Sequence, residues 1–417
     1  MNRRRKTRNR MLTAAVLLVA AALPGRSFAD VDWHGFVEGG YGLRTADDPR
    51  FDDVRDYTLN ETRAQLKLSS YGDRGEAFLR LDIMQDNVLG GGAGWEIREG
   101  FLRFNTLADR LEVKAGRQAL TWGTGDLIFV NDLFPKDWVS FFIGREDQYL
   151  KAPADAVRLG VFGLPFTVDL VATPAFTPDR LPDGSRLSFY SPPGVMGPPT
   201  APENEIEEGE IALRLSKYFG DYNFSLYGYR GFWKTPAGMT GGGLPYYPNL
   251  AVYGASARST GFGGVYWLEA GYYDSDEDRN GSDPMVANSE VRMLAGYERQ
   301  LATDLNATVQ WYGEFMGDHD KYAAGLPEGA REQDELRQIV TLRLEKMALY
   351  HTIRLSLFTF YSPTDEDVYV RPMVSYKVTD EVEIAAGGNL FEGQSDRTQF
   401  GQFDKNDNLY TRIRYTF

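Results

Sequence analysis

The sequence ends in Arg412-Ile413-Arg414-Tyr415-Thr416-Phe417, where apolar and polar side chains alternate. Successive side chains of a β-strand point to opposite faces. One face of such a strand would carry Leu409, Thr411, Ile413, Tyr415 and Phe417, and the other Tyr410, Arg412, Arg414 and Thr416. Transmembrane β-barrels are built from strands with one apolar, lipid-facing side and one polar side, so the terminus predicts a membrane strand.

The other end of the sequence predicts export. Residues 2–10 are strongly basic, an apolar run follows from Met11 to Leu23, and small residues stand at Ser27 and Ala29. This is the pattern of a signal peptide, here residues 1–29. The apolar run is shorter than the roughly 20 residues that a spanning helix needs. An aromatic terminus such as Tyr415 and Phe417 resembles the signal by which the barrel-assembly machinery recognises bacterial outer-membrane barrels, so we expect this location.

Composition excludes several classes of protein. The formal charge is −14, and it becomes −21 when residues 1–29, with seven basic residues and no acidic ones, are removed. A nucleic-acid-binding protein needs a basic surface. The chain has no cysteine, which excludes disulfides, thiolate metal sites and a cysteine nucleophile. Gly-x-Ser-x-Gly, Walker and His-Glu-x-x-His motifs do not occur, so we expect no enzyme and no cofactor.

Alternation recurs along the rest of the chain. Apolar Ala64, Leu66 and Leu68 alternate with polar residues, and residues 72–75 (Gly-Asp-Arg-Gly) then form a turn before the next alternating segment. Beyond the first three segments, candidates lie at 95–107, 110–120, 154–163, 165–174, 207–219, 221–233, 250–259, 262–273, 290–302, 304–316, 334–347, 350–361, 365–376, 380–391 and 408–417. The pattern predicts one all-β domain over residues 31–417, a transmembrane antiparallel barrel of about 18 strands with short periplasmic turns and long external loops.

The inward face is predicted to be rich in arginine. The register that turns apolar residues toward lipid turns the following residues toward the lumen: Arg63, Lys67, Arg80, Arg103, Arg158, Arg214, Arg292, Arg337, Arg343, Arg354, Arg371, Arg412 and Arg414. Carboxylates point inward as well. Two interpretations stay open: an ion-pair lattice that stiffens the lumen, or unpaired guanidinium groups that form a path for an anionic solute.

The segment from Thr121 to Pro153 is the candidate constriction of the lumen. Barrels of 16 to 18 strands leave room for an aqueous channel, which a loop can narrow. The segment shows no clear alternation, and its residues Trp122, Asp126, Asn131, Asp132 and Trp138 are those we expect inside the barrel.

At this segment the chain resembles a known family. Gly116-Arg117-Gln118, the following Trp122-Gly123, and Glu99-Gly100-Phe101-Leu102 and Gly271-Tyr272-Tyr273-Asp274 elsewhere are similar to the alginate-export group of outer-membrane porins. The resemblance implies a monomeric 18-stranded barrel whose arginine-rich lumen passes an anionic polysaccharide. It also implies that Arg117 faces the lumen. The carboxylates among the arginines argue against alginate itself.

The acidic stretch from Asp274 to Gly281 is a weak calcium candidate through Asp274, Asp276 and Asp278. Oxygen ligands stand at alternate positions, but the glycine at the sixth position and the glutamate at the twelfth are missing, so a solvated loop near lipopolysaccharide is the better interpretation.

The function that we expect is a porin-like channel for hydrophilic, anionic solutes or an anionic polysaccharide, acting as a monomer among outer-membrane lipid and lipopolysaccharide. Two alternatives remain: a plugged or sheath-like barrel that serves as a conduit for a periplasmic partner, and a structural or adhesion barrel.

Overall fold

The computed structural model describes residues 29–48, 56–191, 194–203, 208–326 and 331–417. The predicted signal peptide therefore lies outside the described residues, except for Ala29, which begins the first strand. No helix in the described part of the chain is long and apolar enough to cross a membrane.

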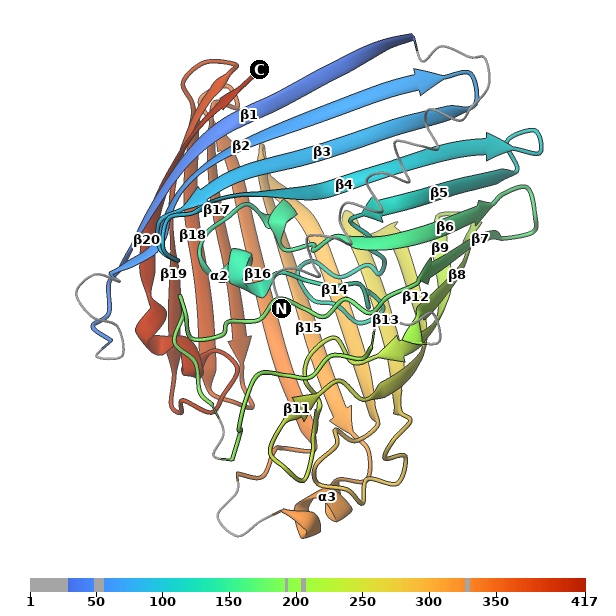
Figure 1. Ribbon diagram of the computed structural model, residues 1–417, viewed down its shortest axis with the longest axis vertical. Coiled ribbons are helices and arrows are strands. Elements are labelled where there is room, and N and C mark those ends of the chain that lie inside the picture. Colours follow the sequence, from blue (N-terminus) through green and yellow to red (C-terminus); the bar gives the residue numbers. More distant parts are fainter. Residues whose placement is uncertain (1–28, 49–55, 192–193, 204–207, 327–330) are drawn as a thin grey trace.

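Eighteen antiparallel strands form one closed sheet (Figure 1). Each barrel strand pairs with the next barrel strand along the chain, β9 with β12 included, and β1 also pairs with β20, so that Phe36 to Arg44 lie opposite Thr416 to Asn408. The prediction of an antiparallel barrel is therefore confirmed. A closed barrel leaves no unpaired strand edge, which is required where water cannot satisfy backbone groups.

The strand bounds follow the predicted alternation closely. They are β1 Ala29–Arg44, β2 Tyr57–Gly72, β3 Gly75–Asp86, β4 Ala93–Thr106, β5 Leu111–Gln118, β6 Ala154–Val161, β7 Thr167–Thr173, β8 Glu210–Phe219, β9 Tyr222–Phe232, β12 Asn249–Gly261, β13 Gly264–Ser275, β14 Glu290–Ala302, β15 Leu305–Met316, β16 Leu336–Ala348, β17 Ile353–Ser362, β18 Asp367–Lys377, β19 Val382–Gly393 and β20 Asn408–Thr416. Two short strands, β10 Gly238–Met239 and β11 Pro245–Tyr246, pair outside the barrel sheet.

The two rims of the barrel differ. At one rim the connections are turns of a few residues, such as 73–74, 220–221, 262–263 and 303–304. This short-turn rim also holds the C-terminus, because the amide and carbonyl of Phe417 each bond to Gly35 at 2.9 Å. At the other rim the connections are mostly longer, among them 119–153, 174–209, 233–248 and 317–335.

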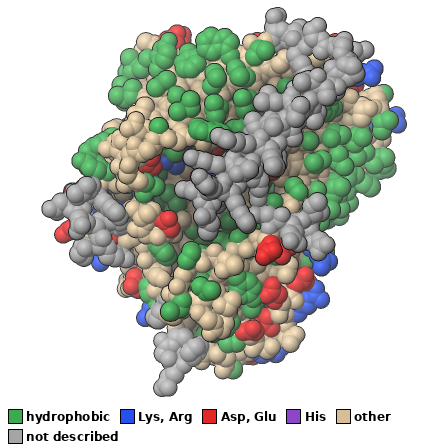
Figure 2. Space-filling view, in the orientation of Figure 1, with side chains coloured by type: hydrophobic (Ala, Val, Ile, Leu, Met, Phe, Trp, Pro, Cys, Tyr) green, Lys and Arg blue, Asp and Glu red, His purple; other side chains and the backbone are tan. Residues whose placement is uncertain are grey.

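The outer surface of the wall is apolar. Figure 2 shows hydrophobic side chains gathered over the strands, whereas acidic side chains gather near the long connections at the bottom of the view. Trp33, Trp95, Tyr253 and Leu268 are each about 60% exposed, and the strand neighbours of Leu268 on the opposite face, Trp267 and Glu269, are buried. Such a surface suits the hydrocarbon of a bilayer rather than water.

Among the residues that the structure describes, helices are short and lie in connections: α2 Trp138–Phe142, η2 Asp147–Tyr149, α3 His319–Gly325 and η4 Gly401–Asn406. Figure 1 shows α2 inside the outline of the barrel and α3 beyond the long-connection rim.

Candidate functional site

The segment 119–153, which we call the inner loop, folds into the lumen. It joins β5 to β6, and its apolar side chains belong to the same buried cluster as side chains from the inner face of the wall. That cluster contains Ile128, Val130, Phe141, Phe142, Ile143 and Leu150 from the inner loop, with Leu294, Phe358, Phe360, Tyr369, Phe391 and Tyr410 from the strands. The inner loop thus fills part of the barrel instead of lying on its surface.

Aromatic rings hold the second half of the inner loop. The ring of Phe142 lies 4.8 Å from that of Phe403, 5.6 Å from Tyr369 and 5.7 Å from Phe391, measured between centroids. Phe141 lies 5.8 Å from Tyr369. Edge-on and tilted contacts of this kind add stabilisation beyond the area that they bury.

A buried wall carboxylate holds the first half. Glu269 on β13 accepts hydrogen bonds from the backbone amides of Thr124 and Asn131, at 2.7 and 2.8 Å, and from their side chains, at 2.8 and 3.0 Å. Glycine at position 254 permits this approach, because a Cβ there would overlap the amide oxygen of Asn131. Four donors from the inner loop therefore converge on one carboxylate.

Asp126 is a second anchor of the first half. Its carboxylate pairs with both ends of the Arg343 guanidinium, at 2.6 and 2.9 Å. Its backbone amide and carbonyl bond to the side chain of Gln310, each at 2.8 Å. The predicted constriction residue Asp126 thus joins the inner loop to β15 and β16.

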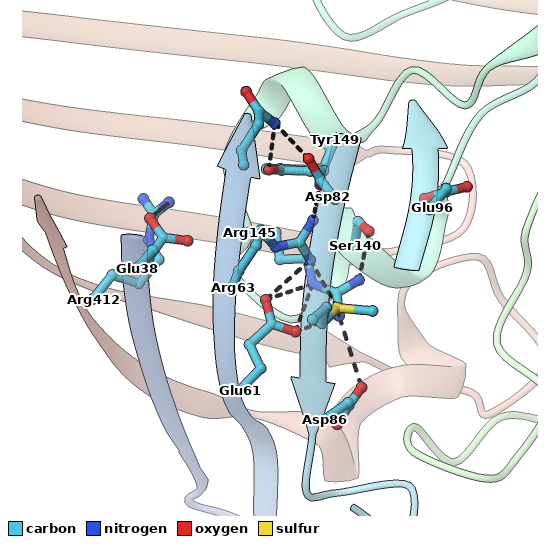
Figure 3. Close-up of polar contacts among 12 residues, drawn as sticks. Glu38, Glu61, Arg63, Asp82, Asp86, Glu96, Ser140, Arg145, Tyr149 and Arg412 are labelled. Carbon is cyan, nitrogen blue, oxygen red and sulfur yellow. Dashed lines mark hydrogen bonds and ion pairs between the residues drawn. The ribbon is translucent and has the colours of Figure 1, made fainter. Parts of the chain in front are cut away.

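The opposite wall is bound by Arg145 of the inner loop. Figure 3 shows this guanidinium and that of Arg63, on β2, both directed at the carboxylate of Glu61. Arg63 also bonds to Asp82 on β3 at 2.7 Å and lies 4.1 Å from the ring of Tyr149. A charge in such a buried cluster is costly unless it is paired and hydrogen-bonded, as these are.

The remaining predicted constriction residues contact the inner loop itself or the connection 174–209. Trp122 stacks edge-on against Phe134 at 5.1 Å, Asp132 accepts from the hydroxyl of Thr121 at 2.7 Å, and the indole of Trp138 donates to Asp179 at 2.9 Å.

Two neighbouring carboxylates attach the middle of the inner loop to basic side chains of the wall. Glu146 accepts from Arg414 at 2.6 Å, and Asp147 accepts from Arg371 at 3.1 Å. Burial acts to raise the pKa of each carboxyl, but the arginines outweigh it and lower both pKa values below their ordinary values of 4.5 and 3.8.

The attachment of the inner loop through Glu146 and Asp147 should therefore be lost only at a pH below the ordinary pKa values of these carboxyls. A carboxyl whose pKa is lowered in the docked state stabilises that state above its ordinary pKa, and the stabilisation is lost as the pH falls through the lowered value. We expect the inner loop to stay docked above pH 4.5 and to loosen only at lower pH, with the contribution of Asp147 lost below pH 3.8. Fluorescence of Trp122 and Trp138 during acid titration measures this. A double variant, Glu146→Gln with Asp147→Asn, should lose this transition; if the transition persists there, other groups cause it.

Thirteen of the fourteen basic residues predicted for the lumen lie on the face that turns away from the exposed apolar side chains. Arg117 has the parity of Ala115, which lies opposite exposed Val157, although its side chain lines the cavity described below. Within the described residues each of the thirteen arginines has a carboxylate at ion-pair distance, whereas Lys67 has none. Arg158 and Arg214, for example, share Asp169, and Arg117 forms a two-point pair with Asp155 at 2.8 and 2.9 Å. For the arginines, the ion-pair lattice is therefore the arrangement that the structure shows.

A run of cations nevertheless follows the inner wall near the short-turn rim. We call it the basic strip, and it consists of Lys67, Arg80, Lys114, Arg158, Arg214 and Arg258. Lys67 lies opposite Arg80, and Lys114 opposite Arg158, in the strand register. Among the described residues, the strip's ion pairs are formed with two carboxylates, those of Glu99 and Asp169.

Sequence reasoning missed Lys114, Arg258 and Arg98 as lumen residues. Lys114 and Arg258 have the inward parity of their strands, so a residue-by-residue count of the alternation could have found them. Lys114 lies over the ring of Phe101 at 3.8 Å, and Arg258 over that of Trp267 at 5.5 Å. Arg98 could not be found in this way, because the β3–β4 register shifts next to it and changes the parity.

A cavity of about 2260 Å³ occupies the other half of the lumen. Its lining combines residues of β2 to β5 and the inner loop with residues from 176–191, 195–202, 236–247 and 284–290 near the long-connection rim. We call this space the vestibule. The vestibule and the basic strip thus lie toward opposite rims, with the inner loop reaching into the lumen between them.

The calcium candidate does not assemble. Arg279 lies 3.3 Å from Asp274 and also pairs with Asp276, and Asp278 accepts the backbone amides of Ser282 and Asp283. In the described ranges, no three acidic or histidine side chains are grouped so that they could hold a metal ion.

No protein-family model and no curated protein matches the sequence. Solved structures do match. OccD3 (OpdP) of Pseudomonas aeruginosa has a TM-score of 0.55 and 10% identity, over 93% of this chain and 91% of its own. OccAB4 and OccAB3 of Acinetobacter baumannii have TM-scores of 0.55 and 0.53 with 9% and 11% identity, over 94% and 93% of this chain and 99% of theirs. Identities this low concern the fold alone. That fold is a porin-like bacterial outer-membrane β-barrel.

Proposed function

We propose that the protein is a monomeric outer-membrane channel for hydrophilic anions and not an enzyme. The observation that carries this proposal is the basic strip, six inward cations on β2, β3, β5, β6, β8 and β12 whose ion pairs within the described residues involve two carboxylates. A charged, low-dielectric cleft concentrates ions of opposite sign and speeds their entry. The inner loop narrows the lumen and selects what reaches the strip.

Several features belong to this proposal. Residues 1–29 serve as the signal peptide, and Phe417 with Tyr415 as the signal for barrel assembly; the ring of Phe417 lies 5.7 Å from that of Trp33 on the adjoining strand. Lipopolysaccharide and lipid surround the apolar wall. The alginate-export resemblance makes an acidic polysaccharide one candidate solute, and an alginate oligomer is therefore a useful probe.

Single-channel recording under a salt gradient tests the proposal. The purified mature chain in a planar bilayer should conduct with anion preference, and alginate oligomers should block the current if the polysaccharide is the solute. A stable barrel that conducts nothing would contradict the channel and would favour the plugged or sheath-like conduit, an alternative consistent with the dense packing of the inner loop.

Charge reversal in the basic strip should reduce the anion preference strongly. For the double variant Lys67→Glu with Lys114→Glu we expect the anion-to-cation permeability ratio to fall about tenfold at low salt, because counter-ion enrichment in the cleft is lost. Neither lysine has an ion pair within the described residues, so the barrel loses no pair.

Lys346→Glu is the matched control for charge. Lys346 has the outward parity of β16, next to inward Glu345, and its ammonium donates to the carbonyl of Thr303 at the short-turn rim. The permeability ratio should barely change in this variant. An equal fall in both variants would mean that the strip does not set the selectivity.

A further inference from the structure

The barrel wall is low at three neighbouring strands. β5, β6 and β7 contain 8, 8 and 7 residues, whereas a tilted strand needs about 9–11 residues to cross the hydrocarbon of a bilayer. The pairing of β4 with β5 stops at Gly100, so within the described residues 93–99 have no partner strand on that side. We call residues 93–99 the free edge of β4. Figure 1 shows β5 and β6 stopping well short of the far end of β4, so the wall is incomplete beside this edge.

The free edge lies within the apolar band of the wall. Trp95 and Ile97 lie opposite Ile83 and Leu81 in the β3 register, on the lipid-facing side. Trp95 is 62% exposed, and Ile83 is 52% exposed. An exposed tryptophan of this kind is typical of the aromatic girdle at a membrane interface. Because these side chains lie beyond the last pair that β4 forms with β5, membrane lipid reaches the gap in the wall.

The vestibule extends into this gap. Its lining includes Trp95, Ile97, Arg117 and Asp155, which have the lipid-facing parity of their strands, as well as inward side chains such as Asp82. Arg117 and Asp155 form their two-point pair at the ends of β5 and β6. Ionisable side chains at membrane depth almost always face a water-filled cavity, and this pair does so. One cavity thus contacts both the lumen and the lipid-facing side of the wall. We call the gap between the free edge of β4 and the ends of β5 and β6 the side opening.

The connection 174–209 contacts the free edge without closing the side opening. Arg180 pairs with Glu96 of the free edge and with Asp137 of the inner loop, and the neighbouring Leu181 is 37% exposed. In the described parts of this connection, no backbone group bonds to the backbone of residues 93–99. Side chains therefore screen the side opening, but no strand fills it.

Part of the vestibule lining is apolar. The amide of Met239 donates to the carbonyl of Met285 at 2.8 Å, and the rings of Phe176 and Tyr247 lie 5.0 Å apart between centroids. All four residues line the cavity, and we call them the apolar wall. Met285 is 44% exposed, and apolar surface in contact with water is unfavourable. Methionine side chains also adapt to the shape of an apolar ligand.

We propose that the side opening admits an acyl chain of a membrane lipid, from the leaflet at the long-connection rim, and that the chain lies along the apolar wall of the vestibule. Lipid is present wherever the wall contacts the membrane. Trp95 and Ile97 offer its chain an apolar path from the outer surface to the cavity. The polar head group stays at the membrane interface, where it keeps its hydration.

The vestibule has room for a chain and for water together. A typical small-molecule site encloses about 300–1,000 Å³, whereas the vestibule measures about 2260 Å³. An acyl chain can therefore cover the apolar wall while the Arg117–Asp155 pair keeps its contact with water. The site needs no group that recognises a particular head group, so any lipid with a long acyl chain should occupy it.

Fluorescence quenching by brominated acyl chains tests this proposal. The chain contains no cysteine, so a bimane label can be attached to one introduced thiol in the full mature protein. In vesicles of phosphatidylcholine with brominated chains, the label at Met239→Cys should be quenched nearly as strongly as that at Met293→Cys. Met293 is 47% exposed on the lipid-facing side of β14 and is the positive reference. Ser356→Cys is the negative reference, because Ser356 lies opposite inward Glu345 on a wall of full-length strands.

A charge at the side opening should exclude the chain. Trp95→Glu is expected to reduce quenching at Met239→Cys several-fold, since a carboxylate on the path disfavours an acyl chain. Tyr253→Glu is the matched control, because Tyr253 is 61% exposed on the outer side of β12 and does not line the vestibule. It should leave the quenching unchanged. Heat-modifiable migration on gels shows that each barrel has folded.

Two outcomes would overturn the proposal. If the label at Met239→Cys is quenched no more than that at Ser356→Cys, no acyl chain reaches the apolar wall. If strong quenching persists unchanged in Trp95→Glu, lipid does not enter by the side opening. Neither result depends on ion selectivity, so the proposed anion channel is tested separately.

Discussion

Glu269→Ala is expected to release the first half of the inner loop and to raise the single-channel conductance. Glu269 is 4% exposed and accepts four hydrogen bonds, two each from Thr124 and Asn131. Hydrogen bonds to a charged group contribute about 1.5–3 kcal/mol each, so their joint loss should cost the docked state about 3 kcal/mol or more. That is at least about a hundredfold in the ratio of undocked to docked loop.

Cysteine labelling measures this release directly, because the chain contains no cysteine of its own. Val130→Cys places a thiol where the native side chain is 1% exposed. Its reaction with a charged thiol reagent should become about a hundredfold faster when Glu269→Ala is added. The recordings should show a larger and noisier current.

Two variants control this experiment. Glu269→Gln keeps the shape and one acceptor oxygen, and should lie between the native chain and Glu269→Ala. Glu298→Ala removes an inward carboxylate on neighbouring β14 that makes no hydrogen bond or ion pair with the described inner loop. If it opens the channel as much as Glu269→Ala does, loss of negative charge, and not loop release, explains the result.

Phe142→Ala should destabilise the second half of the inner loop by about 3–5 kcal/mol, the usual cost of a buried phenylalanine. Phe142 is 5% exposed and contacts the rings of Phe403, Tyr369 and Phe391, so its removal leaves a cavity between the inner loop and the wall. Labelling of Ser140→Cys, at a position 1% exposed, should accelerate by two orders of magnitude or more.

Phe262→Ala is the matched control for a lost ring. Phe262 stands in a short turn and is 87% exposed, so its truncation creates no cavity. Urea unfolding of the barrel should be unaffected in Phe262→Ala. If the inner loop and the wall unfold together, the urea concentration at the midpoint of unfolding should fall in Phe142→Ala. An unchanged midpoint with faster cysteine labelling would show that the inner loop opens independently of the barrel.

Alternation made the barrel predictable from sequence because each strand meets two solvents. Residues such as Leu66 and Lys67 must face opposite ways when lipid lies on one side and water on the other. The same reasoning placed the arginines predicted from the alternation on the inner face. The inward fold of the inner loop was predicted instead from the absence of alternation in that segment and from aromatic side chains that needed a place to pack. The reasoning from alternation fails at Arg98, where an irregularity in the β3–β4 register changes which face the side chain occupies. No residue type in the sequence signals this irregularity.

The sequence by itself determined the strands, their two faces and the number of barrel segments, since these depend on neighbours in the chain and on the solvent at each face. Only the tertiary structure decided which charges neutralise one another. Glu269 is joined to Asn131, and Asp126 to Arg343, across long stretches of chain. Strand stagger sets these distances, and periodicity does not encode it. The ion-pair lattice, the basic strip and the apolar wall of the vestibule all arise at that level.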